Sequence, residues 1–373
     1  MYPPQPRSHN RRPQTGTPEV EIDLNTGNVP DELNVLEDTG LAFDFDMSAP
    51  TPIVGDMLDF DFCTGASSID VLNEMLDLPT ENQNQVAVHR TGSQARKPFS
   101  AAHLSCFAQA RVAYSIEHFK SAPKMMVEQK CTPWAHPMLY DEYMPRSLED
   151  AYASCALYIT KNDTNAEFVA RYITSRAEEL TATNLPTTSF EILARTQALI
   201  LYQIMLMFGG NVGFHARAES LLPYLNDIGT LLLPIAAEET DPLGTIPLYP
   251  GTAAQSAWRS YIMRESARRT YLSTVHLTVM CTLLNGQLKS CSHDLILNNR
   301  VTLSAHLWKA ANAFDFAMAW NEKKHFVIKE LDFTQVLKDA QPDDLDVFGN
   351  MLLVGIKGMD DMRGWYHTRG GTL

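Results

Sequence analysis

The stretch "ALILYQIMLMF" at residues 198–208 decides the fold class of this chain. Apolar side chains would cover every face of a helix formed here, whereas a surface helix is apolar along one stripe only. The stretch is too short to span a bilayer, and it contains Gln203. We therefore predict a helix that starts near residue 189, ends at the glycine pair 209–210 and lies in the middle of a helical bundle.

The segments around this helix also have helical periods. Apolar residues of "SAAHLSCFAQARVAYSIEHF" (100–119) fall on one stripe, and Pro123 is expected to follow the end of that helix. Capping-box spacing predicts helix starts at Ser147 with Asp150, Thr164 with Glu167, and Thr188 with Glu191. Further helices are expected at about 215–233, from Trp258 to about 285, at 303–322 and at 343–362.

Residues 234–255 form the longest predicted connection within the helical region. Loops of this length are often functional or mobile in compact domains. No run of alternating apolar and polar residues indicates a strand. The sequence thus predicts an all-α, irregular multi-helix domain over residues 100–373.

Charge is distributed very unevenly along the 373 residues, whose net charge is −14. Residues 1–12 hold three arginines, residues 13–89 hold sixteen acids and no Lys or Arg, and the remainder is nearly neutral. A change of composition of this kind indicates a domain boundary, which we place at about residues 82–100. Residues 1–99 are therefore expected to be a disordered arm that precedes the helical domain.

Three apolar clusters recur inside the acidic block 13–90, namely "LAFDFDM" (41–47), "GDMLDFDF" (55–62) and "SSIDVLNEMLDL" (67–78). Repulsion among the carboxylates opposes a packed core and leaves the aromatic side chains accessible. Alternation of acidic and large apolar residues is typical of transcriptional activation segments. The alternative is a solvated linker whose apolar residues dock back onto the chain's own domain.

The third cluster can fold on contact with a partner. Ser67 and Asp70 have capping-box spacing, and the apolar residues that follow share one helical face. A few such anchors outweigh the cost of ordering only modestly, so dissociation constants on the order of micromolar are expected. The residues predicted to contact coactivators in the whole block are Phe43, Phe45, Met57, Leu58, Phe60, Phe62, Ile69, Leu72, Met75 and Leu76.

No pattern of metal ligands or catalytic residues is present in the sequence. The six cysteines are widely spaced, without a C-x-x-C pair, which argues against a zinc site or a disulfide framework. Cys155 and Cys281 lie in apolar helical patterns and are expected to be buried, reduced thiols. His103, His118 and His136 are scattered and are interpreted as surface or core histidines. Phosphate-binding glycine motifs and a nucleophile elbow are also absent, so we expect no cofactor and no catalytic site.

The start of the chain, "MYPPQPRSHNRRPQTG", contains no apolar core of a signal peptide. We therefore expect a soluble, intracellular protein.

Two acidic pairs leave an enzyme as the alternative. An all-α enzyme of the terpene-cyclase type would bind Mg²⁺ through such motifs, and "DDLD" (343–346) and "MDDM" (359–362) are the candidates. A divalent site also needs facing carboxylates on another helix, and the sequence identifies none. Helix capping explains the first pair better, and an exposed turn explains the second.

The segment "RESARRT" (264–270) is the densest charged feature of the helical region. Glu265 and Arg269 have the i, i+4 spacing of an ion pair on a helix surface. Contact with nucleic acid through the arginines is one interpretation, but Trp258, Ile262 and other apolar neighbours favour a partly buried structural network. The region as a whole has almost no net positive charge, which argues against phosphate binding.

Several local patterns together resemble the regulatory domain of fungus-specific transcription factors of the zinc binuclear cluster type. They are "PWAHPMLYDEYMPRSLEDAYASCALY" (133–158), "WRSYIMRESARRT" (258–270) and "DDLDVFGNMLLVGIKGMDDMRGWYHTRG" (343–370). The resemblance spans roughly residues 100–370 and implies an all-α regulatory domain, a nuclear location and control of transcription. The residues expected to organise this domain are Trp134, Trp258, Glu265, Arg268 and Arg269.

The resemblance departs from the family at the DNA-binding module. Relatives carry six closely spaced cysteines that bind zinc, whereas this sequence has only Cys63 before residue 100. Either "RSHNRRPQ" (7–14) is the tail of a linker behind a lost zinc cluster, or the chain reaches DNA through another protein. The expected partners are therefore coactivators or other transcription proteins, with a homodimer as a further possibility. Regulators of this type often control gene clusters of secondary metabolism.

Overall fold

The computed structural model describes residues 106–210, 214–238, 241–284 and 300–373, and every structural statement below concerns these residues. The acidic block, its apolar clusters and the predicted domain boundary lie outside the described residues. All of the described residues belong to one compact unit.

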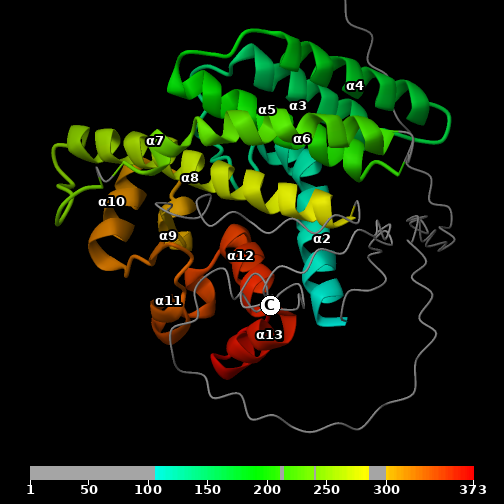
Figure 1. The fold of residues 1–373 in the computed structure, drawn as a ribbon. Coiled ribbons are helices and arrows are strands. Elements are labelled where there is room, and N and C mark those ends of the chain that lie inside the picture. The colour runs from blue at the N-terminus through cyan, green and yellow to red at the C-terminus, as the bar shows by residue number, and fades with distance from the viewer. Residues whose placement is uncertain (1–105, 211–213, 239–240, 285–299) are drawn as a thin grey trace, which may run out of the picture. The chain divides into compact units, whose positions relative to one another are not determined.

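The described residues confirm the all-α fold class (Figure 1). The first part of the chain forms α2 (Cys106–Gln129), α3 (Arg146–Ile159), α4 (Ala166–Ala182), α5 (Ser189–Met207), α6 (His215–Thr230), α7 (Leu233–Ala236) and α8 (Thr252–Leu284). The second part forms β1 (Arg300–Thr302), α9 (Ala305–Trp308), α10 (Ala313–Glu322), β2 (Val327–Lys329), α11 (Thr334–Asp339), the 3₁₀ turn η4 (Pro342–Asp344), α12 (Val347–Lys357) and α13 (Met359–Thr368).

Helix α5 is the centre of the bundle, as its all-round apolar sequence predicts. It packs against α2, α3, α4, α6 and α8, and every residue from Leu193 to Met207 is buried. The helix has the length and composition of a membrane span, but 83% of its most apolar window lies inside the body. The buried amide nitrogens of two glutamines have partners, since Gln197 donates to the Thr270 hydroxyl at 3.0 Å and Gln203 donates to the Cys281 sulfur at 3.6 Å.

Helix α2 continues past Pro123, so the predicted end at this residue was wrong. A proline inside a helix removes one backbone hydrogen bond and usually bends or ends the helix. Here Ala122, Pro123 and Met126 are buried against the bundle. Burial of this apolar face compensates for the lost hydrogen bond.

Helix α8 joins the two parts of the body. It contacts α5, α6 and α7 on the bundle side and α10 and β1 on the other side. It starts at Thr252, six residues before the predicted start, and the short helix α7 occupies the beginning of the predicted loop. The remaining loop is fastened to α10, because Asn321 hydrogen-bonds both backbone groups of Ile246 and Trp320 donates to the Gly244 carbonyl.

The predicted helix 303–322 is two helices, α9 and α10. The Asn312 side chain accepts a hydrogen bond from the Asp315 amide at 2.9 Å and so starts a new helix. The segment just before α9 forms β1, which pairs antiparallel with β2. Each strand has only three residues, which is too short for an alternation of apolar and polar residues to reveal it.

The predicted helix 343–362 is also divided. Residues Pro342–Asp344 form η4, Asp346 caps α12 by accepting from the Gly349 amide at 2.9 Å, and Gly358 separates α12 from α13. Of the three capping boxes predicted within the described residues, only the cap at Thr188 is formed, with the Glu191 amide donating at 3.3 Å. Helices α3 and α4 have Pro145 and Asn165 at their N-caps instead.

Substitution of Gly358 tests the junction between α12 and α13. Its φ of 99° suits glycine, and an added Cβ would lie 3.0 Å from the Arg111 Nη2 atom. We expect Gly358→Ala to lower the free energy of unfolding in urea by about 1–3 kcal/mol. Gly364→Ala is the matched control, because an added Cβ meets nothing within 4 Å there and alanine favours the helix. Equal effects of the two substitutions would contradict this account of the junction.

Candidate functional site

One turn of α8 buries a cluster of charged side chains. Glu265, Arg268 and Arg269 have exposed fractions of 0%, and Arg264 is 4% exposed. The prediction of an ion pair between Glu265 and Arg269 is correct in its partners, with 3.1 Å between Nε and Oε1, but both groups are fully buried rather than partly buried. Because these guanidinium groups are inaccessible, the contact with nucleic acid considered from the sequence does not fit this structure.

Arg269 is the centre of the cluster. Its guanidinium donates to the Asp346 carboxylate at 2.6 Å and to the Glu265 carboxylate at 3.1 Å. It also donates to the carbonyl oxygen of Thr302 at 2.9 Å and to that of Pro133 at 3.3 Å. Burial would lower the pKa of Arg269, but the charges of Asp346 and Glu265 outweigh burial and raise it above its ordinary value.

Two aromatic rings enclose the same guanidinium. Its Cζ atom lies 3.9 Å from the Trp308 ring centroid and 4.9 Å from the Phe348 ring centroid. A planar guanidinium stacks on aromatic faces while its edge donates hydrogen bonds, which a lysine ammonium cannot do. Arg269 thus joins α8 to β1, α9, the start of α12 and the segment that follows α2.

The other charged groups attach the loop between α7 and α8 to the same centre. Arg268 donates to the carbonyl oxygens of Ala236 at 3.0 Å and of Glu238 at 2.6 Å. Arg264 donates to Asp241 at 3.2 Å, and Arg300 donates to the same carboxylate at 2.5 Å. The cluster therefore holds four guanidinium groups and three carboxylates. Its contacts hold in place the loop between α7 and α8, which the sequence analysis predicted to be functional or mobile.

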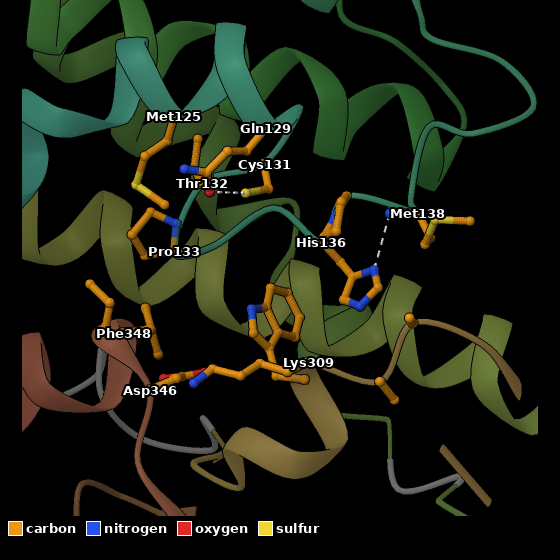
Figure 2. Close-up of a pocket in the computed structure, with 15 residues that line it drawn as sticks. Met125, Gln129, Cys131, Thr132, Pro133, His136, Met138, Lys309, Asp346 and Phe348 are labelled. Carbon is orange, nitrogen blue, oxygen red and sulfur yellow. Dashed lines mark hydrogen bonds between the residues drawn. The ribbon is translucent and has the colours of Figure 1, made fainter. Parts of the chain in front are cut away.

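A cavity of about 390 Å³ adjoins the Arg269 cluster. Figure 2 shows Pro133 and His136 of the segment after α2 on one side of it, and Lys309, Asp346 and Phe348 on the other. We call this cavity the pocket. Its complete lining is Met125, Gln129, Cys131, Thr132, Pro133, His136, Pro137, Met138, Trp308, Lys309, Ala310, Ala311, Asp346, Val347 and Phe348.

His136 is a core histidine, which was one of the two roles predicted for it. It is 2% exposed, and its Nδ1 atom accepts a hydrogen bond from the Met138 amide at 3.1 Å. Burial lowers its pKa to about 4, the Arg269 charge acts in the same direction, and a hydrogen bond with the Trp308 backbone partly opposes them. At neutral pH the imidazole is therefore uncharged.

Of the two tryptophans predicted to organise the body, Trp134 belongs to the segment that follows α2 and Trp258 belongs to α8. Trp134 is fully buried beside Phe119, with 5.7 Å between ring centroids, and its carbonyl accepts from the Thr270 hydroxyl at 3.4 Å. Trp258 is half-buried, with its ring 6.3 Å from that of His136. Trp134 thus contacts the charged turn of α8 through Thr270, whereas Trp258 lies beside His136 of the segment after α2. The ten predicted coactivator contacts lie outside the described residues.

The acidic pairs do not form a metal site in the part of the chain that the structure describes. Asp343, Asp360 and Asp361 are exposed, and Asp344 lies 2.8 Å from a ring nitrogen of His306. Asp346 points away from these carboxylates, toward Arg269 and the N-terminus of α12. No group of three or more potential metal ligands occurs among the described residues. These positions disfavour the Mg²⁺-dependent enzyme alternative.

The thiols of Cys155 and Cys281 are free and fully buried, as predicted. Burial raises the pKa of each to about 12, so both are protonated at neutral pH. The thiol of Cys131 is half-buried at the pocket, and burial raises its pKa as well. A protonated thiol is a poor nucleophile and a poor metal ligand, so these groups do not suggest catalysis.

Sequence reasoning missed the role of Asp346 and the existence of the pocket. The carboxylate of Asp346 was interpreted as part of an acidic segment that caps a helix, and it does cap α12. It also forms an ion pair with Arg269, which lies 77 positions away in the sequence. A local sequence pattern does not indicate a pairing between residues that lie so far apart in the chain. The pocket is lined by stretches that lie far apart in the sequence, so no single stretch indicates it.

The chain is similar to transcription factor gsfR2 of Penicillium aethiopicum. The two sequences are 27% identical over 263 residues, which cover 69% of this chain and 62% of that protein. The matching part thus spans less than two thirds of the relative's length. No family model matches the chain, and no solved structure matches it.

Replacement of Arg269 tests the importance of the buried cluster. Arg269→Lys keeps the positive charge but loses the planar fork, so several of its buried partners lose their hydrogen bonds. We expect the free energy of unfolding in urea to fall by about 3–5 kcal/mol. Arg259→Lys on the same helix is the matched control, because Arg259 pairs with Glu142 in a largely exposed ion pair and its replacement should change little. An equally small effect at both positions would show that the cluster is dispensable.

The lowered pKa of His136 predicts a pH dependence of stability. In the unfolded chain a histidine titrates near pH 6.5, whereas His136 in the folded protein titrates near 4. Between these values the unfolded chain binds more protons, so stability falls as the pH falls. We expect the loss of unfolding free energy between pH 7 and pH 5 to be about 1–2 kcal/mol larger in the natural protein than in His136→Gln. The same loss in both proteins would mean that His136 is not buried in its neutral form.

Proposed function

We propose that this protein is a transcriptional regulator, and specifically an activator, in which an acidic arm contacts coactivators and a helical body regulates the arm. The similarity to a protein named as a transcription factor, over 69% of this chain, is the observation that most supports the proposal. The order of the three motifs that resemble fungus-specific regulatory domains agrees with it.

The activating part is assigned to residues 13–90 on physical grounds. Sixteen acids without a nearby base keep such a segment from forming a core, and its phenylalanines gain free energy when they enter an apolar groove of a partner. Binding of this kind is weak and exchangeable, which suits the recruitment of coactivators.

The body is assigned a regulatory rather than a catalytic role. The charged residues buried on α8 are engaged in structural pairs, and its described thiols and acidic pairs are not arranged for chemistry. Its buried arginines do not suit phosphate binding, so DNA would be reached through another protein or through a zinc module that these residues do not include. A nuclear location follows from the proposed role.

Two finer parts of the proposal rest on the family resemblance alone. Regulators that resemble this chain often control a gene cluster of secondary metabolism, and we propose that role here. A homodimer is proposed as the assembly. The relative's printed name supports the general role only.

A reporter assay tests the arm directly. Residues 13–90 fused to a foreign DNA-binding domain should activate a reporter gene, and Phe60→Ala with Phe62→Ala should reduce activation several-fold, because each ring contributes roughly 1.5–3 kcal/mol when buried. The matched control is Ile22→Ala with Leu24→Ala, which removes two apolar side chains of the same segment outside the three clusters.

Absence of activation by the natural segment would contradict the proposed function. Equal losses in the two double variants would contradict the assignment of the phenylalanines, because the clusters would then have no special role. Protein levels of the fusions should be compared by immunoblot so that degradation is not mistaken for loss of contact.

A further inference from the structure

We infer that the pocket beside the Arg269 cluster binds a small amphipathic anion, namely a ring-containing apolar molecule with one acidic group. This inference goes beyond the proposed function and does not depend on it, since it rests on the lining of the pocket alone. The volume of about 390 Å³ lies within the range of small-molecule sites in proteins.

The interior of the pocket offers an apolar surface. Met125, Pro133, Met138 and the ring systems of Trp308 and Phe348 all line it. Thioether and aromatic side chains adapt to flat, polarisable ring systems. An apolar ring that displaces water from such a surface gains about 25 cal/mol for each Å² of apolar area that becomes buried.

Most polar groups of the lining are already occupied by partners within the protein. His136 accepts from the Met138 amide, and Thr132 accepts from the Ala135 amide at 3.0 Å. The two oxygens of Asp346 accept from Arg269 and from the Gly349 amide. A ligand therefore finds few polar groups to pair with inside the pocket, so its buried part is expected to be apolar.

Lys309 supplies the charge that selects an anion. Its side chain is exposed and lines the pocket, and Figure 2 shows it in an extended conformation. Within the described residues its amino group takes part in no ion pair. An acidic group of a ligand could thus lie beside this ammonium at the edge, while the rings occupy the interior.

A ligand in the pocket would contact residues that also hold the body together. Pro133, Trp308, Asp346 and Phe348 line the pocket and also contact Arg269. A ligand that binds only the folded arrangement of these walls stabilises the body by mass action. Binding is therefore expected to raise the midpoint of thermal unfolding as well as to give a direct signal.

Two fluorescent probes that differ by one charge test the inference on the full chain. Both 8-anilinonaphthalene-1-sulfonate and its uncharged analogue N-phenyl-1-naphthylamine contain two aromatic ring systems. We expect one molecule of either probe to bind per chain. Lys309→Met should weaken binding of the sulfonate about 3-fold and leave the uncharged probe unchanged. Lys323→Met is the matched control, because Lys323 is an exposed lysine that does not line the pocket.

A second variant separates the pocket from other apolar surfaces. Ala311 is exposed and lines the pocket, so Ala311→Trp should fill the space without disturbing the core. We expect this variant to weaken both probes on the order of 10-fold or more, and to keep its helical circular dichroism. Failure of both probes to bind, unchanged binding to Ala311→Trp, or equal effects of Lys309→Met on the two probes would each overturn the inference.

Discussion

The burial of one positive charge, on Arg269, is the constraint on which the rest of the body depends. A guanidinium removed from water is tolerated only when carboxylates and carbonyl oxygens replace the water around it. Those partners are Glu265 on the same helix and three residues from segments that are distant in the sequence, namely Pro133, Thr302 and Asp346. The need to satisfy one side chain therefore fixes the positions of α8, β1, α9, the start of α12 and the segment after α2 relative to one another.

The residues that surround Arg269 also form part of the pocket. Trp308 and Phe348 stack on the guanidinium and line the pocket at the same time. A change at the pocket would thus be transmitted to the buried cluster, and from there to the loop that Arg268 and Asp241 hold in place. In our inference the body binds a small molecule, whereas in the proposed function the acidic block supplies the contacts to other proteins.

The sequence predicted the parts of the fold that local patterns determine. The all-round apolar run of α5, the cap at Thr188 and the ion-pair spacing of Glu265 and Arg269 are each short-range signals, and each is present in the structure. The predictions failed where tertiary contacts override a local rule. Pro123 stays inside α2 because its face is buried, and the long predicted C-terminal helices are divided at Asn312, Asp346 and Gly358. The pocket and the pairing of Asp346 depend on contacts between distant segments, which no single stretch of sequence contains.

Native-state hydrogen exchange of two backbone amides tests the central role of the cluster most directly. The Thr302 amide donates to Glu265 at 2.9 Å, and the Gly349 amide donates to Asp346 at 2.9 Å, so both amides report on the carboxylates that surround Arg269. If the cluster holds the body together, both amides should exchange only through global unfolding, with the same free energy of opening as the amides in the middle of α5. Exchange of either amide through a local opening of much lower free energy would contradict this account.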